Sequence, residues 1–223
     1  MQTLQAPNTQ AFAASSGCAA RQVELAPGIS LTGSFMRFDR NEEIFAEEES
    51  ADFVYKVISG AVRDVRILSD GRRQIGAFHL AGEVFGLESG EIHLYSAEAV
   101  VDSEIAVVRR SALERAVQDD AVAARKLWGL TSKDLLRLQE HMLLLGRKSA
   151  VERVASFLLS MSTRGAVGET VELPMSRSDI ADYLGLTIET ISRTLTHLAR
   201  DHSISMPSSR RIVLHSRLAM AGC

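Results

Sequence analysis

The chain has 223 residues, of which 46% are hydrophobic and 24% charged, and its formal charge at pH 7 is −3. This length and apolar content suffice for two domains with separate cores, and no apolar run is long enough to predict a transmembrane helix or a membrane partner. The two cysteines, Cys18 and Cys223, exclude a disulfide framework and a paired-cysteine metal site, so a reducing cytoplasm is the expected compartment.

Residues 1–22 are rich in Gln, Ala and Ser and lack an apolar period, which predicts a flexible tail. From residue 23 to residue 118, short β-branched runs such as Phe53–Ile58 and Ala61–Leu68 alternate with glycines and other turn residues. Asp70-Gly71 is typical of a β-hairpin turn. We therefore expect an antiparallel β domain over residues 23–118, as a closed barrel or a jelly roll.

A helical period follows Ser111, and Asp119 and Asp120 favour the start of a long helix, which we assign to residues 119–146. Its heptad stripe consists of Ala124, Trp128, Thr131, Leu135, Leu138, Met142, Leu145 and Ser149. Such a stripe predicts a homodimer, with an interface formed by Trp128, Thr131, Leu135, Leu138, Met142 and Leu145. The alternative is a helix that packs only on its own β domain. Leu143 and Leu144 favour the dimer, because they lie outside the stripe and need cover on a second side.

A second domain is expected over residues 147–223. It opens with an amphipathic helix at residues 148–161, and a short strand is expected at residues 171–173. Near its end, the apolar residues of Ile204–Met206 and Ile212–Leu214 flank a polar turn that contains proline and two arginines. This pattern predicts a two-stranded wing.

The stretch Ser176–Leu198, SRSDIADYLGLTIETISRTLTHL, has two helical periods that are separated at Gly185. Ser176 and Asp179 match a capping box, in which a serine side chain and an acidic side chain cap the first helix reciprocally. Thr187 is suited to cap the second helix. Two short helices around a three-residue turn are the pattern of a helix-turn-helix, whose second helix enters the major groove of DNA.

The outer face of the second helix carries short, acidic and basic side chains that are suited to contact base edges. The predicted DNA-contacting residues are Ile188, Glu189, Ser192 and Arg193 on this face, together with Thr187, Arg177, Arg210 and Arg211. The arginines outside the helix are expected to contact phosphates. The charge distribution agrees with DNA binding by the second domain. Residues 147–223 carry 10 Lys and Arg against 7 Asp and Glu, whereas residues 1–146 carry 15 against 21. The alternative is a surface helical hairpin with a solvated charged face.

The segment DIADYLGLTIETISRTL closely resembles the helix-turn-helix of the Crp/Fnr transcription regulators, above all the FixK-like and Fnr-like branches. Residues 55–86, YKVISGAVRDVRILSDGRRQIGAFHLAGEVFG, resemble the sensor barrel of the same family. The resemblance implies an α+β fold with an N-terminal sensor-type β domain, a long dimerisation helix and a C-terminal winged helix-turn-helix. It also implies a homodimeric regulator, in most relatives an activator that contacts RNA polymerase, in pathways tied to oxygen limitation, nitrogen fixation or denitrification.

The resemblance further implies a DNA sequence. In the family, Glu, Ser and Arg at the positions of Glu189, Ser192 and Arg193 read TTGA half-sites. We therefore expect a palindrome similar to TTGA, six free bases and TCAA. The wing departs from the family pattern, because His202 and Ser203 stand where relatives commonly place glycine before the isoleucine that matches Ile204, so the geometry of that turn is left open.

The resemblance allows three cofactors to be considered, and none is expected. Cyclic-AMP-responsive relatives bind the phosphate with an arginine beside a Ser-Ala pair and the ribose with a glutamate, whereas this chain has Tyr95 before Ser96-Ala97 and Leu87 after Gly86. Neutral tyrosine does not replace a charge-assisted partner of the phosphate. An iron–sulfur cluster needs about four thiolates, and the β domain contains no cysteine.

Haem is harder to exclude, because His79 and His93 are potential axial ligands, so a haem-responsive or small-ligand-responsive regulator is the alternative. Oxygen-sensing relatives place an aspartate in the dimer interface, and Leu138 occupies that position here, which favours a dimer without a cofactor. No HxH metal set and no Ser/His/Asp or Cys/His set occurs, so an enzyme is not expected. A passive cyclic-nucleotide-binding module would leave the helix-turn-helix unexplained.

Overall fold

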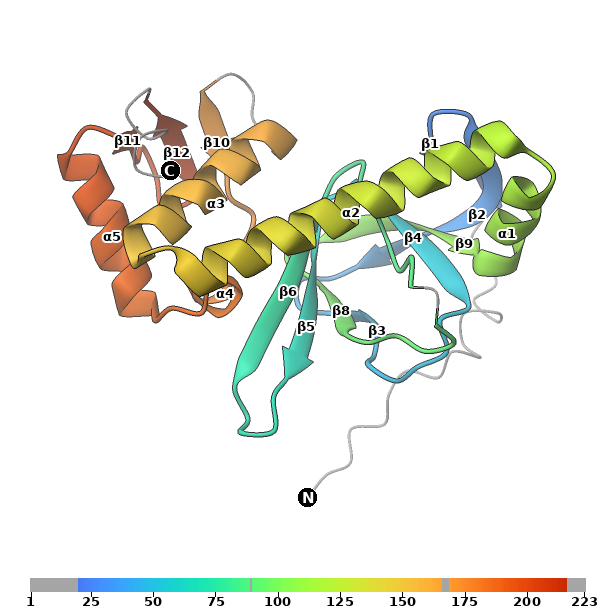
Figure 1. Cartoon of the computed structure of the whole chain (residues 1–223), viewed down its shortest axis with the longest axis horizontal. Coiled ribbons are helices and arrows are strands. Elements are labelled where there is room, and N and C mark those ends of the chain that lie inside the picture. The colour runs from blue at the N-terminus through green and yellow to red at the C-terminus, as the bar shows by residue number, and fades with distance from the viewer. Residues whose placement is uncertain (1–19, 89, 166–168, 216–223) are drawn as a thin grey trace.

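The structure is a computed structural model that describes residues 20–88, 90–165 and 169–215 (Figure 1). A β domain and a smaller, mainly helical domain follow one another, and one long helix, α2 (Ala121–Arg147), runs along both. The predicted α+β fold class is confirmed. The first strand begins at Arg21, inside the segment predicted as a tail, and residues 1–19 of that prediction lie outside the described part. Within the described residues, no helix has the length and apolarity that crossing a membrane requires.

The β domain consists of two antiparallel sheets that share a core, which is closer to the predicted jelly roll than to a single closed sheet. The strand orders are β1-β2-β9-β4-β7 and β3-β8-β5-β6. The strands are β1 (Arg21–Ala26), β2 (Ile29–Phe38), β3 (Glu43–Phe45), β4 (Phe53–Ser59), β5 (Ala61–Ile67), β6 (Arg73–Leu80), β7 (Val84–Phe85), β8 (Ser96–Ala99) and β9 (Ser103–Arg109). The predicted Asp70-Gly71 turn joins β5 and β6, which form a hairpin that projects from the domain (Figure 1).

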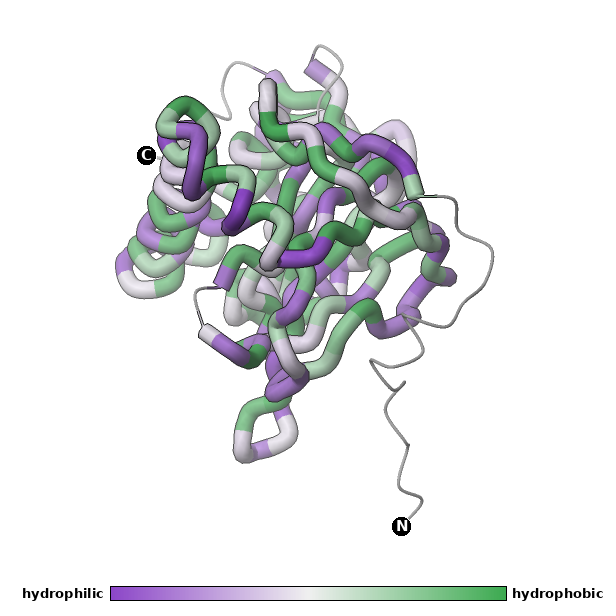
Figure 2. Tube along the Cα trace, turned by 90° about the vertical axis from the view of Figure 1, so that its right-hand side faces the viewer, coloured by the Kyte–Doolittle hydropathy of each residue, from purple (hydrophilic) through white to green (hydrophobic). Residues whose placement is uncertain are grey.

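Strand β9 contributes side chains to two hydrophobic cores, one on each of its faces. Ile105 and Val107 face the core between the sheets, whereas Ala106 and Val108 face a second core beneath helix α1 (Arg110–Gln118) and the start of α2. Successive side chains of a strand point to opposite faces, so a strand covered on both sides reads as a continuous apolar run. Figure 2, which looks at the molecule end-on, shows hydrophobic and hydrophilic residues interspersed along the chain.

The start of α2 agrees with the prediction from Asp119 and Asp120. The Asp120 carboxylate accepts hydrogen bonds from the backbone amides of Val122, at 2.8 Å, and Ala123, at 3.2 Å. These bonds satisfy two of the amides that a helix start leaves without an intrahelical partner.

The second domain combines three helices with a small sheet. Its elements are α3 (Ala150–Gly165), β10 (Thr170–Glu172), α4 (Arg177–Leu184), α5 (Ile188–Arg200), β11 (Ile204–Ser205) and β12 (Arg211–Leu214). The prediction of a two-stranded wing is incomplete, because β12 pairs with β10 as well as with β11. Pairing of segments about forty residues apart is not visible in a local pattern.

The two domains share a hydrophobic core. Ala61, Val65, Ile75, Phe78 and Val100 of the β domain belong to the same buried cluster as the inward faces of α3, α4 and α5. The ring of Phe78 lies 6.3 Å from that of Phe157 in α3 and 5.3 Å from that of Tyr183 in α4, as measured between centroids. The second domain is therefore packed directly against the hairpin β5–β6.

Two glycines with left-handed backbone provide a matched test of the packing around the shared core. Gly60, between β4 and β5, has φ +88, and a Cβ there would lie 2.2 Å from Ser103 Oγ and 2.8 Å from Asp102 O. Gly71 has φ +82 and nothing within 4 Å. We expect Gly71→Ala to lower the free energy of unfolding by about 1–2 kcal/mol, the cost of left-handed backbone for alanine. Gly60→Ala should cost roughly 1–3 kcal/mol more through overpacking.

Urea unfolding of both variants measures this difference. Ser103 Oγ donates to the Val101 carbonyl at 2.6 Å and accepts from the Ala61 amide at 3.1 Å, so moving it away from an added methyl group costs these hydrogen bonds. Equal destabilisation by the two substitutions would contradict the proposed packing.

Candidate nucleic-acid interface

Helices α4 and α5 are joined by a tight three-residue turn, as predicted. Ser176 Oγ accepts a hydrogen bond from the Asp179 amide at 3.1 Å, and the Asp179 carboxylate accepts one from the Ser176 amide at 3.0 Å, which completes the capping box. Gly185 ends α4 with φ +62, a conformation that glycine adopts without steric cost. Thr187 Oγ1 then accepts from the Thr190 amide at 3.2 Å and caps α5.

The inner face of α5 is fixed by burial. Ile191, Leu195 and Leu198 are at most 4% exposed and belong to the core shared by both domains. Thr194 is also buried on this face. Because one side of the helix is fully packed, the side chains on the opposite side have a defined direction into solvent.

The predicted base-reading residues lie on that outer side. Ile188 is 46% exposed, Glu189 and Arg193 are exposed, and Ser192 is half-buried. Glu189 and Arg193 lie four residues apart and could form an ion pair, but within the described part of the chain no ion pair joins them. Hydrogen bonds from its own backbone amide and from Thr187, together with the charge of Arg193, lower the pKa of Glu189 and keep it ionised at neutral pH.

A groove of about 580 Å³ extends the same surface along α5. It is lined by Val151 of α3 and by Ser192, Arg193, Thr194, Thr196, His197 and Arg200 of α5. Sequence reasoning did not select Thr196, His197 or Arg200 as DNA contacts. The signal was present, because positions three, four and seven residues after Arg193 continue one face of a helix.

The predicted phosphate contacts occupy two places. Arg177, at the start of α4, donates from Nη1 to Ser192 Oγ at 3.2 Å, so it lies beside the outer face of α5. Arg210 and Arg211 are exposed in the wing, and Arg211 Nη2 lies 3.4 Å from the Glu172 carboxylate. These side chains present positive charge to solvent on the second domain.

The wing begins at the turn whose geometry the sequence left open. His202 has φ +55, so it adopts a left-handed conformation that favours glycine. Its amide donates to Ala199 O at 3.2 Å, and the Ser203 amide donates to Leu198 O at 2.9 Å. The turn after α5 is therefore closed by backbone bonds in spite of the missing glycine.

The heptad stripe of α2 is exposed over most of its length. Trp128 is 73% exposed and Met142 is 67% exposed, while Leu135 and Leu138 are 56% and 55% exposed. Thr131 is also exposed. Leu143 and Leu136 widen this apolar band. We use the name apolar stripe for Trp128, Thr131, Leu135, Leu138 and Met142.

Two residues near the end of α2 pack against their own chain. Leu145, assigned to the dimer interface, is half-buried against the shared core of its own chain, and Leu144 is only 8% exposed for the same reason. Leu144 therefore gives no evidence for a partner chain on a second side of α2, because the second domain of its own chain covers it. Leu143, by contrast, is 60% exposed.

The interior of the β domain is filled by aromatic and histidine rings. His93 is 0% exposed and stacks on Phe45 at 3.6 Å between centroids, and His79 stacks on Phe85 at 5.0 Å. Both histidines face carboxylates. His79 Nε2 lies 2.8 Å from Asp64, and His93 Nδ1 lies 3.3 Å from Glu88. Burial acts to lower the pKa of His79, but the Asp64 carboxylate outweighs burial and raises it.

The residues that would hold a cyclic nucleotide do not fit that ligand. Tyr95 stands at the position expected for the phosphate-binding arginine, and the neighbouring Ser96 hydroxyl already accepts a hydrogen bond from the Glu47 amide at 2.9 Å. Leu87 stands at the position expected for the ribose-binding glutamate and packs beneath α1 and α2. Among the described residues, no group of three or more His, Cys, Asp or Glu side chains is arranged to hold a metal ion.

Comparison with known proteins supports the division into a β domain and a helix-turn-helix domain. A Crp-like helix-turn-helix domain matches residues 152–222, and a cyclic nucleotide-binding domain matches residues 35–120. The nitrogen fixation regulation protein FixK of Azorhizobium caulinodans is 49% identical over 197 residues, which are 86% of this chain and 79% of that protein. FixK of Rhizobium meliloti is 46% identical over 171 residues, which are 76% of this chain and 77% of that protein.

Solved structures agree with the sequence comparison. FixK2 from Bradyrhizobium japonicum is similar with a TM-score of 0.83 and 51% identity, over 86% of this chain and 98% of that chain. A transcriptional regulator of the CRP family from Thermus thermophilus is similar with a TM-score of 0.68 and 26% identity, over 84% of this chain and 96% of that chain. These relatives are transcription regulators and not enzymes, as the sequence predicts. The chain therefore belongs to the Crp/Fnr family of DNA-binding transcription regulators, in its FixK-like branch.

Proposed function

We propose that the protein is a homodimeric, sequence-specific regulator that binds a palindrome similar to TTGA, six bases and TCAA, and that it activates transcription. The observation that carries the proposal is the outer face of α5, where Ile188, Glu189, Ser192 and Arg193 project from a helix whose inner face is fully buried. A rigid helix with free polar ends on one side is what base reading in the major groove requires.

Each of the four side chains has a matching partner in the half-site. The guanidinium of Arg193 is suited to donate to guanine O6 and N7, and the ionised Glu189 is suited to accept from a cytosine amino group. Ile188 offers an apolar contact for a thymine methyl, and Ser192 offers an adaptable hydroxyl. Thr187, Arg177, Arg210 and Arg211 contribute backbone and phosphate contacts, which add affinity without sequence information.

The apolar stripe on α2 supports the dimer. Four large apolar side chains that are more than half exposed and repeat with heptad spacing are costly in water and suited to pair with a second copy of the same helix. A two-fold dimer presents two copies of α5 to two half-sites of a palindrome, one helical turn of DNA apart. Activation is proposed from relatives such as the transcriptional activatory protein AadR of Rhodopseudomonas palustris, 40% identical over 173 residues. Contact with RNA polymerase is proposed from the family resemblance alone. The bacterial cytoplasm is the compartment of such a target.

We further propose that DNA binding needs neither cyclic AMP nor an iron–sulfur cluster. Tyr95 and Leu87 replace the two charged anchors of a cyclic nucleotide, and the rings of Phe45, Phe85 and His93 pack against one another in the interior of the β domain. The second candidate is a regulator that responds to haem or to another small ligand. It is less well supported, because His79 and His93 each already face a carboxylate.

Arg193→Ala tests the reading residue. We expect it to weaken binding by roughly 1–3 kcal/mol per half-site and to relax the preference for guanine, because the bidentate donor is lost. Arg177→Ala is the matched control, since it removes the same charge beside α5 and should weaken all sequences similarly and flatten the salt dependence. Titration against the palindrome and a guanine-substituted copy separates the two effects. Unchanged discrimination by Arg193→Ala would show that another residue reads the guanine.

Leu138→Asp tests the dimer interface. Sedimentation of the cofactor-free protein at micromolar concentration should show a dimer, and the variant should shift it toward monomer, because two carboxylates would face each other in the stripe. Ile67→Asp is the control, as it makes the same change at a similarly exposed apolar residue on the β5–β6 hairpin, where the exposed fraction is 61% compared with 55% at Leu138. A monomeric wild type, or equal effects of both substitutions, would rule out this interface.

Cyclic AMP should neither bind tightly nor change the affinity for DNA. A buried phosphate charge without a charged partner loses several kcal/mol of interaction, so calorimetry at micromolar protein should give no binding heat. The DNA titration described above, repeated at millimolar cyclic AMP, provides the functional readout. Micromolar or tighter binding would contradict the proposal.

A further inference from the structure

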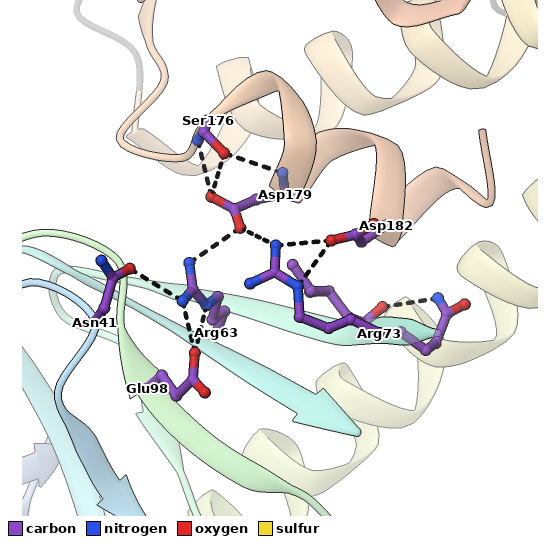
Figure 3. A network of polar contacts seen from close by, with 9 residues as sticks. Asn41, Arg63, Arg73, Glu98, Ser176, Asp179 and Asp182 are labelled. Carbon is purple, nitrogen blue, oxygen red and sulfur yellow. Dashed lines mark hydrogen bonds and ion pairs between the residues drawn. The ribbon is translucent and has the colours of Figure 1, made fainter. Parts of the chain in front are cut away.

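Four charged side chains connect the β5–β6 hairpin to the first helix of the helix-turn-helix (Figure 3). Arg63 of β5 and Arg73 of β6 point toward Asp179 and Asp182 of α4. Arg63 and Asp179 are separated by 116 positions in the sequence. We call these four residues the interdomain charge network.

Asp179 performs two tasks at once. Its Oδ1 accepts hydrogen bonds from Arg63 Nη1 at 3.0 Å and from Arg73 Nη2 at 2.7 Å. Its Oδ2 accepts from the amide and the hydroxyl of Ser176, at 3.0 and 2.7 Å. The carboxylate that closes the capping box of α4 is therefore the same one that binds the β domain.

Arg63 is itself held firmly on the β-domain side. Its Nε and Nη2 donate to Glu98 at 2.9 and 2.6 Å, and Nη2 also donates to Asn41 at 3.1 Å. The side chains of Arg63 and Asp179 are 6% and 5% exposed. A planar guanidinium bound on several sides has one geometry, so it fixes where the Asp179 carboxylate lies.

Arg73 forms the more accessible half of the network. Its Nε donates to Asp182 at 2.8 Å, and its side chain is 29% exposed. Arg72, its neighbour on the hairpin, is 77% exposed and pairs only locally, with Asp70 at 2.7 Å. The chain thus offers two adjacent arginines, of which one contacts the second domain in this structure and the other contacts its own turn.

The network is ionised under ordinary conditions. Burial acts to raise the pKa of Asp179, but the hydrogen bonds from Ser176 and the charges of Arg63 and Arg73 outweigh burial and lower it. A lowered carboxyl pKa contributes stability that is complete above the ordinary value of 3.8 and is lost as the pH falls through the lowered value. At neutral pH the carboxylate is therefore available to both arginines.

A second set of contacts fixes α2 and α3 to the same β domain. Glu83, in the turn between β6 and β7, lies 2.7 Å from Arg137 of α2 and 2.6 Å from Arg164 of α3. His141 of α2 donates from Nε2 to Tyr183 O of α4 at 2.8 Å, and the two rings stack at 4.0 Å. The helix with the apolar stripe and the helix-turn-helix are thus both tied to the β5–β7 region.

These contacts leave the DNA-reading face open. Ile188, Glu189 and Arg193 are exposed although α4 is bound to the hairpin. The turn at Gly185 is closed by the Leu186 amide, which donates to Ala181 O at 3.0 Å, so α5 follows any movement of α4. The network therefore affects the position of α5 relative to α2. It does not affect the exposure of the DNA-reading face of α5.

Stability alone is a weak explanation of such a network. Burying charges costs desolvation, and replacing a buried ion pair by apolar residues is often neutral or stabilising. The apolar contacts of Phe78 with Phe157 and Tyr183 already hold the domains together, but they restrict orientation less than directional hydrogen bonds do.

We propose that Arg63 and Arg73 are positioning residues for DNA recognition, which hold α4, and through it α5, at one orientation to the apolar stripe and so set the half-site spacing that the dimer accepts. The inference rests on the proposed palindrome-binding dimer for its functional consequence. Its structural part, a single fixed orientation of α5 to α2, is independent of DNA and of dimerisation.

The first experiment measures orientation without DNA. Spin labels at Lys133→Cys on the exposed side of α2 and Thr196→Cys on α5, in a chain that also carries Cys18→Ser and Cys223→Ser, report one distance by pulsed dipolar spectroscopy. Labelled chain is diluted into an excess of unlabelled chain, so that each dimer or monomer contributes one intramolecular pair. We expect one narrow distance distribution in the wild-type background and in Arg72→Glu, and a broadened or shifted distribution in Arg73→Glu, where Asp179 and Asp182 repel the new carboxylate.

The second experiment measures spacing. Affinities are determined for palindromes whose half-sites are separated by five, six, seven and eight bases. We expect the ratio of affinities for six bases over the other spacings to fall at least tenfold in Arg73→Glu and to stay unchanged in Arg72→Glu, which removes the same positive charge from the same hairpin. A general loss of electrostatic attraction would lower the DNA affinity of both variants together and leave the ratio of affinities between spacings unchanged.

The outcomes separate the two proposals. A wild type that binds no palindrome would defeat the proposed function, while the distance measurement would still decide the orientation. An unchanged distance distribution in Arg73→Glu, or an unchanged spacing ratio in a variant that binds DNA, would overturn the positioning role. Circular dichroism melting of Arg73→Glu confirms that the measured protein is folded, and Arg73→Ala, which adds no repulsive charge, provides a milder variant that should shift both readouts in the same direction.

Discussion

Helix α2 packs one face along both domains of its own chain and leaves the opposite, apolar face uncovered, and the rest of the molecule is arranged around that division. Ala123 is buried beneath the β domain at one end, and Leu144 is buried in the core shared with the second domain at the other. Between them, Arg137 and His141 bind groups of both domains on the covered side. On the opposite side Trp128, Leu135, Leu138 and Met142 are each more than half exposed and belong to the stripe that we assign to the dimer.

The second domain is held by two interactions of different character. An apolar layer around Phe78 supplies most of the burial, whereas charged side chains at its edge supply direction. Asp179 joins the two, because it belongs to the capping box of α4 and to the interdomain charge network. A local signal for the start of a helix thus also determines how the DNA-binding domain sits on the β domain.

Residues 35–120 of the β domain match a cyclic nucleotide-binding domain, but the side chains in its interior pack against one another. The rings of Phe45, Tyr55, Phe85 and His93 form a stacked cluster between the sheets, and Tyr95 lies against Gly76, where an added Cβ would meet its ring at 3.2 Å. Such an interior is rigid, because close-packed rings have few alternative arrangements. A rigid β domain provides a fixed support for α2 and α4.

The sequence by itself determined the features that depend on near neighbours along the chain. The capping box of Ser176 and Asp179, the turn at Gly185, the cap at Thr187 and the outward direction of the α5 side chains follow from spacing within a few residues. The start of α2 at Asp120 and the hairpin at Asp70-Gly71 follow from the same kind of signal. Family resemblance extended these local features to the whole fold.

Tertiary structure alone decided what depends on distant segments. The pairing of β10 with β12, the packing of Leu144 and Leu145 against the second domain of their own chain, and the contact of Arg63 with Asp179 join residues that are far apart in the sequence. His202 has a left-handed backbone just before the buried Ser203 and Ile204, at the point where β11 begins and pairs with the distant β12. The physical reason is common to all of these cases: a local pattern specifies which face of an element is apolar or charged, but only the packed chain determines which other element meets that face.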